Sequence, residues 1–489
     1  MKRVYRTSSI VLLAAAAGFI AALFYCQTYS VSADRQKSPA PDPDCFNVTA
    51  YGAIGDNGHD DTAAFQAAFK AAAAVQGKVL IPAPKINYKL TGPITIKPAS
   101  DRQLRINVEA RGGYSSITYS GPSNRSVFIT YGLKDSTFEG VKVQLAAGVS
   151  GVVVWDMRCS PVYSSNSNIL FRNCFIALGT GGRNIGWRTT PGGGFGDFAT
   201  LHWQECYVQG SGPSLGDIAW QNGTTNSLPW TFTNCFFSCL WRGYLSGNIG
   251  TTTTADVAAA DAAIPVESTT GFPPAGMLQI NAERIRYRGI TAASFTGCAR
   301  GADHTKATVF QGAGHVVNQY QPDLEGGVLL GGMSFYWYGG GGSGNAKDFM
   351  FTTAGSYAIF GGRFENGQRF VQVGSGSANW AAPINIQSCD IREYNPPDGI
   401  LFYLRSPVQL HIQSCNVGGQ DRPFGAAAIT TLTAAGGFGS IHVADSAIHA
   451  LDPFYKLDSA HWQLALDRVA LVNREGNATG YAKMPARSP

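Results

Sequence analysis

Three acidic residues are candidates for catalysis, because hydrolysis of a glycosidic bond uses a pair of carboxylates. The two groups stand about 5–5.5 Å apart in retaining enzymes and about 6.5–9.5 Å apart in inverting ones. Asp156 and Asp217 lie in equivalent segments separated by one further copy, and Glu365 lies in a later copy. If these segments stack about 4.8 Å apart, Asp156 and Asp217 fall near the inverting separation. Each of the three can instead be a solvated or turn-forming residue.

Arginines in the same segments raise a second chemistry, cleavage of an acidic polysaccharide by a lyase. A lyase needs a base, together with acidic groups that hold a cation against the uronate. Arg188, Arg242 and Arg369 can serve in binding or as the base. Calcium suits carboxylate oxygens, but the sequence has no dense acidic cluster. We therefore expect no cofactor and no metal site, with calcium as the one ion considered.

Tryptophans supply candidate sugar-binding surfaces, because amphipathic flat rings are favoured at binding interfaces. Trp203 and Trp241 are the candidates that accompany the acids and arginines. Trp155, Trp187 and Trp220 share a phase with apolar strand residues, so we expect them to fill an interior. Burial inside the fold is the competing interpretation for the other tryptophans too.

A repeat of short apolar strands must position these residues. Each copy ends in a polar corner followed by a cysteine. The spacing between these cysteines is 32 residues from Cys174 to Cys206, 29 from Cys206 to Cys235 and 26 from Cys389 to Cys415. A unit of this size cannot bury its apolar side alone, so units must stack. The repeat predicts an all-β fold, a right-handed parallel β-helix.

A second strand aligns in each copy, at residues 152–156, 184–188 and 217–221. Side chains alternate between the two faces of a strand. The alternation predicts one outward column that contains Asp156, Arg188 and Gln221. It also puts Ile218 and Trp220 together on the opposite face.

An insertion interrupts the repeat. Residues 251–317 lack the pattern and predict a small inserted β module between solenoid parts at 45–250 and 318–479. Glycines 339–342, next to Tyr336-Trp337-Tyr338, predict a flexible loop before the coils resume near Phe349.

The N-terminal segment predicts export. Residues 1–33 combine an early positive charge, an apolar run and a small-residue cleavage site, which is typical of a signal peptide. Retention of the apolar run 10–25 as a membrane anchor is the alternative. Residues 34–44 are interpreted as a linker and residues 480–489 as a disordered tail. The expected location is secreted, periplasmic or cell envelope.

Composition limits the partners. Charged residues make up 14% of the chain, the net charge is only +5, and 59 glycines accompany many short polar side chains. This composition favours an extracellular, turn-rich β protein and, without a basic stripe, argues against a nucleic-acid partner. The cysteines lie within apolar runs, so they are interpreted as small buried hydrophobic residues rather than disulfides.

The opening of the solenoid resembles the start of pectate-lyase-like proteins of the rhamnogalacturonase/epimerase-like β-helix type, which include phage tailspikes. The resemblance lies in Tyr51-Gly52-Ala53, Gly55-Asp56, Asp60-Asp61-Thr62 and Val79 to Ala83. It implies a β-helix plugged by a capping helix over about 60–76, whose amides Asp60 or Asp61 can cap. The insertion is similar to small modules of phage tail proteins. The catalytic motifs of polygalacturonase-type members are absent from the coils.

Two functional hypotheses follow. The first is an exported, carbohydrate-active protein, a glycoside hydrolase or polysaccharide lyase that acts on an acidic or envelope polysaccharide. The alternative is a non-catalytic, phage-derived tailspike-like or adhesin-type protein that binds carbohydrate. A polysaccharide is the expected partner in both, a membrane is a partner only if the N-terminal anchor is retained, and the tailspike resemblance implies a homotrimer as one assembly to test.

Overall fold

The computed structural model describes residues 44–481, except for 99–102, 112–114, 124, 160–164, 191–196, 224–226, 247–249, 267–268, 270–271, 273–274, 281–282, 303, 313–314, 321–332, 352–354, 374–381, 405–406, 420–427, 432–437, 451–453, 458–460 and 473–477. The predicted signal peptide 1–33, the predicted linker 34–44 except for Asp44, and residues 482–489 of the predicted tail 480–489 lie outside the described residues. In the described part of the chain, no helix is both long and apolar enough to span a bilayer.

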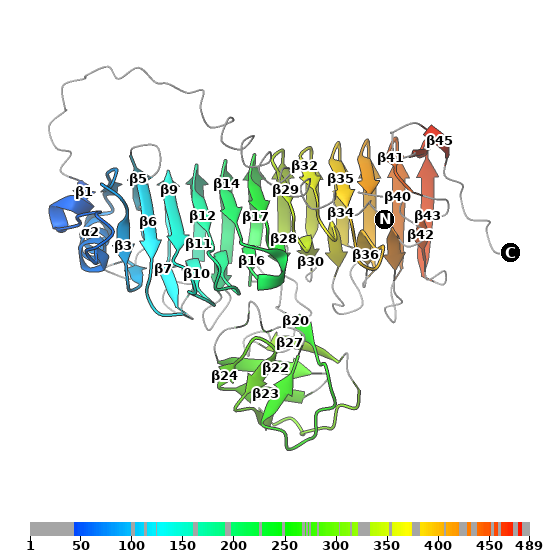
Figure 1. The fold of residues 1–489 in the computed structure, drawn as a ribbon, viewed down its shortest axis with the longest axis horizontal. Helices are drawn as coiled ribbons and strands as arrows, with labels where there is room; N and C mark the ends of the chain where they lie inside the picture. The colour runs from blue at the N-terminus through cyan, green and yellow to red at the C-terminus, as the bar shows by residue number, and fades with distance from the viewer. Residues whose placement is uncertain are drawn as a thin grey trace, which may run out of the picture. The chain divides into compact units, whose positions relative to one another are not determined.

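Three long sheets form a right-handed solenoid, as predicted, and their strands are parallel except for the last strand of sheet B. The chain visits sheets A, B and C in turn, so that each circuit adds one strand to each sheet (Figure 1). Sheet A contains β1 (Cys45–Asn47), β2 (Lys78–Ile81), β5 (Asn107–Ala110), β8 (Lys134–Glu139), β11 (Ser165–Arg172), β14 (Asp197–Gln204), β17 (Ser227–Thr233), β28 (Met333–Tyr338), β31 (Ser356–Phe360), β34 (Ala382–Gln387), β37 (Val408–Gln413), β40 (Gly439–Ala444) and β43 (Trp462–Asp467).

Sheet B follows sheet A across a sharp corner. Its strands are β3 (Tyr88–Leu90), β6 (Ser115–Tyr119), β9 (Val141–Leu145), β12 (Phe175–Ala177), β15 (Tyr207–Gln209), β18 (Phe236–Ser238), β29 (Gly341–Ser343), β32 (Arg363–Glu365), β35 (Asp390–Tyr394), β38 (Asn416–Gly419), β41 (Ala447–Ile448), β44 (Ala470–Val472) and β45 (Ala478–Tyr481). The corner residues Asn173, Glu205 and Asn234 all have a positive φ near 50°. Repetition of this conformation on consecutive rungs keeps the two sheets in register.

Sheet C completes each circuit. Its strands are β4 (Ile94–Ile96), β7 (Ser126–Tyr131), β10 (Val153–Arg158), β13 (Ile185–Thr190), β16 (Ile218–Asn222), β19 (Arg242–Ser246), β30 (Lys347–Phe351), β33 (Val371–Val373), β36 (Phe402–Leu404), β39 (Ile429–Thr431) and β42 (Tyr455–Lys456). Asp156 pairs with Arg188, and Arg188 pairs with Gln221, on consecutive strands. The predicted outward column is therefore confirmed.

Helix α2 (Thr62–Val75) is the predicted capping helix, and a short 3-10 turn, η1 (Val48–Tyr51), precedes it. Its apolar face, including Phe65 and Phe69, is completely buried in the core of the solenoid. Asp60 accepts a bond from the Thr62 amide at 3.1 Å. Asp61 caps no helix amide. Its carboxylate instead binds the backbone N–H of Ile54 at 2.7 Å and fixes the turn before the helix.

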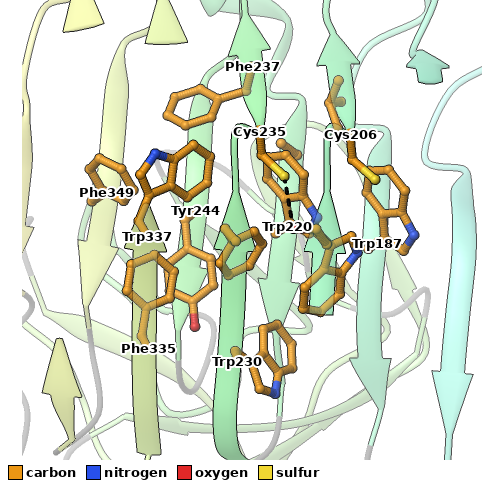
Figure 2. Packing of buried hydrophobic residues seen from close by; sticks show 14 of the residues in the cluster. Trp187, Cys206, Trp220, Trp230, Cys235, Phe237, Tyr244, Phe335, Trp337 and Phe349 are labelled. Carbon is orange, nitrogen blue, oxygen red and sulfur yellow. Dashed lines mark hydrogen bonds between the residues drawn. The ribbon is translucent and has the colours of Figure 1, made fainter. Parts of the chain in front are cut away.

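The interior of the solenoid is filled by stacked rings and thiols (Figure 2). Trp187 and Trp220 stack on adjacent rungs with ring centroids 5.4 Å apart and an interplanar angle of 4°. Trp155, Trp187 and Trp220 are buried in the interior, as predicted. The five repeat cysteines are also buried, with no disulfide among them. Such close stacking of large rings contributes to the hydrophobic burial of the core.

The inserted module has its own core. A five-stranded sheet contains β20 (Gly250–Thr252), β27 (Val316–Tyr320), β22 (Gly276–Ile280), β23 (Glu283–Tyr287) and β26 (Ala299–Ala302), and a three-stranded sheet contains β21 (Ala263–Pro265), β25 (Ser294–Thr296) and β24 (Gly289–Ile290). Inside the module, Arg300 and the completely buried Glu283 form a two-pronged ion pair at 2.7 and 2.8 Å. The module leaves and re-enters the solenoid through the antiparallel pair β20 and β27.

A group of apolar side chains on the outer face of sheet C joins the core of this module. Val153, Ile185 and Ile218 form one column in register, and Leu245 and Met350 continue the neighbouring column of Gln221. All five apolar residues are buried in one cluster with the module's apolar side chains. The sequence-based prediction that Ile218 and Trp220 share a face was wrong. Ala219 and Trp220 both belong to the interior cluster, so the simple alternation breaks between them, and Ile218 points outward.

The glycine run 339–342 also differs from the prediction. It is not a flexible loop, because β28 ends at Tyr338 and β29 begins at Gly341 within one ordered coil. A side chain at Gly341 would place its Cβ 1.9 Å from the carbonyl oxygen of Arg363 on the next rung. Glycine is therefore required here by the close approach of neighbouring backbones.

Candidate functional site: an arginine pocket on sheet C

A pocket of about 310 Å³ lies on the outer side of sheet C, at β7, β10 and β13. Four of its lining residues are arginines, Arg125, Arg158, Arg183 and Arg188. The inserted module contributes Thr269, Phe272 and Ile290 to the lining. Among the described lining residues there is no aspartate or glutamate. We call this site the arginine pocket.

Asp156 holds two of the four arginines in place. Its side chain is completely buried, and its Oδ2 accepts bonds from Arg158 Nη2 at 2.6 Å, Arg188 Nη2 at 2.9 Å and the Ser126 hydroxyl at 2.8 Å. Burial alone would raise the pKa of Asp156, but the charges of Arg188 and Arg158 outweigh it and lower that pKa. The carboxylate is thus ionised, and it positions Arg158 and Arg188.

The other two arginines leave the pocket with excess positive charge. Arg125 is exposed and Arg183 is half-buried, with a backbone φ of 57°. Neither forms an ion pair with a described carboxylate. Four guanidinium groups therefore face one carboxylate, Asp156. Guanidinium groups present paired donors that match carboxylate, sulfate and phosphate oxygens, so the pocket can bind an anionic group.

Asp217 is not part of this pocket. It accepts the backbone N–H of Asn184 at 2.8 Å and is completely buried. Burial raises its pKa to about 7, although the bond from Asn184 opposes the shift. Asp217 directly precedes Ile218, whose partners on the adjacent strands are Ile185 and Arg242, whereas Asp156 is paired with Arg188. The two acids lie in different columns, and the structure does not bring them together as a catalytic pair.

Glu365 and Arg369 lie elsewhere on the solenoid. Glu365 is on β32 of sheet B and pairs with Arg363 at 2.6 Å. Arg369 pairs with Asp398, bonds Gln372 Oε1 at 2.9 Å and lies against the Tyr403 ring at 5.0 Å. Neither lines the arginine pocket.

Trp203 cannot present a ring to a sugar. It is completely buried and stacks on Phe232 with centroids 4.7 Å apart. This corrects the expectation that Trp203 binds substrate. Side chains alternate along this strand, so that His202 points outward and Trp203 points into the interior.

Trp241 and Arg242 support the module rather than the pocket. The Arg242 guanidinium lies 3.5 Å from the centre of the Trp241 ring, and Lys347 lies 5.7 Å from it. Trp241 packs against the apolar cluster that joins sheet C to the module.

Sequence reasoning missed Arg125, Arg158 and Arg183. Arg158 had a usable signal, because it follows Asp156 by two residues on the same strand and so shares its face. Arg125 and Arg183 are on the connections that lead into β7 and β13, where no periodic pattern places a side chain.

The three-sheet topology and the capping helix define a right-handed parallel β-helix, the fold that the opening residues predicted. No family model and no curated protein matches the chain.

Solved structures that it resembles include a protein of Geobacillus virus E2 (11% identity, TM-score 0.36), the Yersinia enterocolitica family 28 exopolygalacturonase (11%, 0.45) and the Dettilon tailspike protein (12%, 0.33). The matches cover 96%, 88% and 90% of this chain, respectively. The chain spans 79% of the exopolygalacturonase but only 65% of the viral protein and of the tailspike. At these values the comparisons assign no activity.

Proposed function

We propose that the protein is an exported, carbohydrate-active β-helix protein that recognises the anionic groups of an acidic polysaccharide. One observation carries the proposal: four arginines surround a pocket of about 310 Å³ whose described lining contains no carboxylate. A uronate or other acidic sugar offers a carboxylate for the arginines. It also offers an apolar ring face for the wall that Phe272 and Ile290 form.

Recognition is the function that this geometry supports best. Hydrolysis needs a second carboxylate at the site, and Asp156 is already held by Arg158 and Arg188. Arginine stays protonated in proteins, so it does not provide a lyase base. The hydrolase and lyase hypotheses therefore remain predictions, as do the export signal in residues 1–33 and the homotrimer.

The test removes charge from the pocket without exposing Asp156. The double variant Arg125→Gln/Arg183→Gln leaves the Asp156 network intact. Its matched control, Arg111→Gln/Arg468→Gln, removes two exposed arginine charges that pair with surface carboxylates outside the pocket. We expect the Kd for polygalacturonate or alginate, measured by calorimetry, to rise at least about tenfold in the first variant only, because two charge-assisted contacts are lost.

Equal affinity of the wild type and the pocket variant would refute the proposal. In parallel, reducing ends and unsaturated-uronate absorbance are measured on the same polysaccharides. Binding without either product supports recognition alone. A product whose formation is lost in the pocket variant would place catalysis at this site.

A further inference from the structure

A row of aromatic side chains lies on the outside of the solenoid, on sheets other than sheet C. The six rings are Phe175, Tyr207, Phe236, Tyr336, Tyr338 and Phe360. Phe175, Tyr207 and Phe236 pair in register on consecutive strands of sheet B. Tyr336, Tyr338 and Phe360 continue on the next two strands of sheet A, β28 and β31. We call this surface the aromatic stripe.

The rings of the stripe are exposed or half-buried, and ring contacts order two groups of them. Phe236 is 49% exposed and Tyr338 is 42% exposed. Phe175 and Tyr207 meet edge to face with centroids 5.2 Å apart, and Tyr338 stacks on Phe360 at 5.4 Å. Scattered exposed hydrophobic residues need no explanation, but several large rings gathered on neighbouring strands mark an interaction surface.

The glycine corner keeps the stripe open. The rung after Phe236 has Gly341 at the equivalent position of sheet B. A Cβ added there would come 3.3 Å from the Phe236 ring. Gly341 therefore adds no side chain beside the Phe236 ring.

The surroundings of the rings are polar and carry little net charge. Tyr207 Oη and Ser238 Oγ are hydrogen bonded at 2.6 Å, and Gln209 is exposed on the same face. Arg172 pairs with Glu139 at 3.8 Å and Arg363 pairs with Glu365 at 2.6 Å, while Lys142 Nζ lies 5.1 Å from the centre of the Phe175 ring at one end. The stripe has far less positive charge than the arginine pocket, so its rings and hydroxyls suit an uncharged ligand.

We propose that the aromatic stripe is a second carbohydrate-binding surface, which takes uncharged sugar residues of a polysaccharide chain. The C–H face of a pyranose stacks on flat rings, and its hydroxyls need donors and acceptors such as Gln209 and Ser238. Consecutive rings follow the rung spacing of about 4.8 Å, which is close to the length of one sugar unit in an extended chain. A nucleic acid would also stack, but it requires cations for its phosphates.

The experiment uses the purified protein and three uncharged polysaccharides: hydroxyethyl cellulose, dextran and a galactomannan. The stripe variant is Phe236→Ala/Tyr338→Ala. The control is Phe438→Ala, which removes a ring that is 75% exposed outside the stripe. In affinity electrophoresis we expect at least one polysaccharide to retard the wild type and the control. We expect the stripe variant to bind it at least about tenfold more weakly.

The inference does not depend on the arginine pocket. Arg125→Gln/Arg183→Gln should retain binding to the uncharged polysaccharide, and the stripe variant should retain its affinity for acidic ones. If no uncharged polysaccharide retards the wild type, or if the stripe variant is retarded equally, the inference is overturned. A lower molar mass of the stripe variant in light scattering would also overturn it, by making the stripe an interface between copies of this chain.

Discussion

Arg188 on β13 reaches across one rung to Asp156 on β10, with its Nη2 atom 2.9 Å from Oδ2 of the acid. Arg158, two residues after Asp156, binds the same oxygen at 2.6 Å. A candidate catalytic acid is thereby an anchor for two arginines. The two arginines also explain why the buried carboxylate of Asp156 remains ionised.

Replacement of Asp156 by Asn should destabilise the protein in a pH-dependent way. The pKa of Asp156 is lowered in the folded state, so its stabilising effect is complete above the unfolded value of about 3.9 and is lost as the pH falls toward the folded value. At pH 7 we expect a loss of about 1–2 kcal/mol, since both arginines are partly exposed and solvent screens the pair. Chemical denaturation at pH 7 and at pH 3 measures this loss of unfolding free energy. The exposed control Asp445→Asn should change stability little, and an equal loss in both variants would contradict the role of Asp156.

Replacement of Asp217 by Asn should instead raise the unfolding free energy at high pH. Burial raises the pKa of Asp217 to about 7, so its ionisation weakens the fold as the pH rises from about 3.9 through 7. The new amide side chain would keep the oxygen that accepts the Asn184 backbone N–H. We expect the variant to be about 1–2 kcal/mol more stable than the wild type at pH 8, with the gain shrinking at pH 4. Thermal unfolding at both pH values tests this, and no gain at pH 8 would show that Asp217 does not carry a buried charge.

Substitution of Gly341 by Ala should disturb the corner between sheets A and B. The added Cβ would meet the Arg363 carbonyl oxygen at 1.9 Å, which forces the backbones of adjacent rungs apart. We expect a loss of about 2–4 kcal/mol in unfolding free energy. Gly58→Ala is the control, because its nearest contact would be 3.5 Å. If Gly341→Ala leaves the unfolding free energy unchanged, the close approach of the two backbones at this corner does not require glycine.

A charge at Ile218 should release the inserted module. Ile218 is completely buried within the cluster that joins sheet C to the module. An aspartate there would bring a desolvated carboxylate against the module's apolar side chains, with Arg242 opposite it on the next strand as its one neighbouring cation in register. We expect Ile218→Asp to speed proteolysis within residues 251–320 and to weaken binding of acidic polysaccharide, while the circular dichroism of the solenoid is unchanged. Ile54→Asp, at a residue that is 44% exposed, is the control. Unaltered protection of the module would refute docking through this column.

The repeat made the fold predictable, because stacking imposes one strong pattern on many copies. The cysteine ladder and the column of Asp156, Arg188 and Gln221 followed directly from spacing. Strict alternation failed at Ala219 and Trp220, where two consecutive side chains enter the interior. Because of that irregularity, Ile218 points outward although it was predicted to share a face with Trp220.

The pocket was less predictable because tertiary contacts build it. Arg125 and Arg183 come from connections, and Phe272 comes from the inserted module, far away in sequence. Asp156 and Asp217 had the right chemical type and rung spacing, yet their columns differ. Spacing along the solenoid axis therefore predicts which rung a residue occupies, and position across the strand decides what it contacts.

The antiparallel pairing of Gly250 with Asn318 brings the two ends of the inserted module together. The strands on either side, β19 and β30, remain direct neighbours in sheet C with Arg242 opposite Lys347. The solenoid therefore accommodates the module as a side branch without interrupting its rungs. Any other domain with closely spaced ends could be exchanged at this junction, which makes the wall of the arginine pocket a replaceable part of the binding specificity.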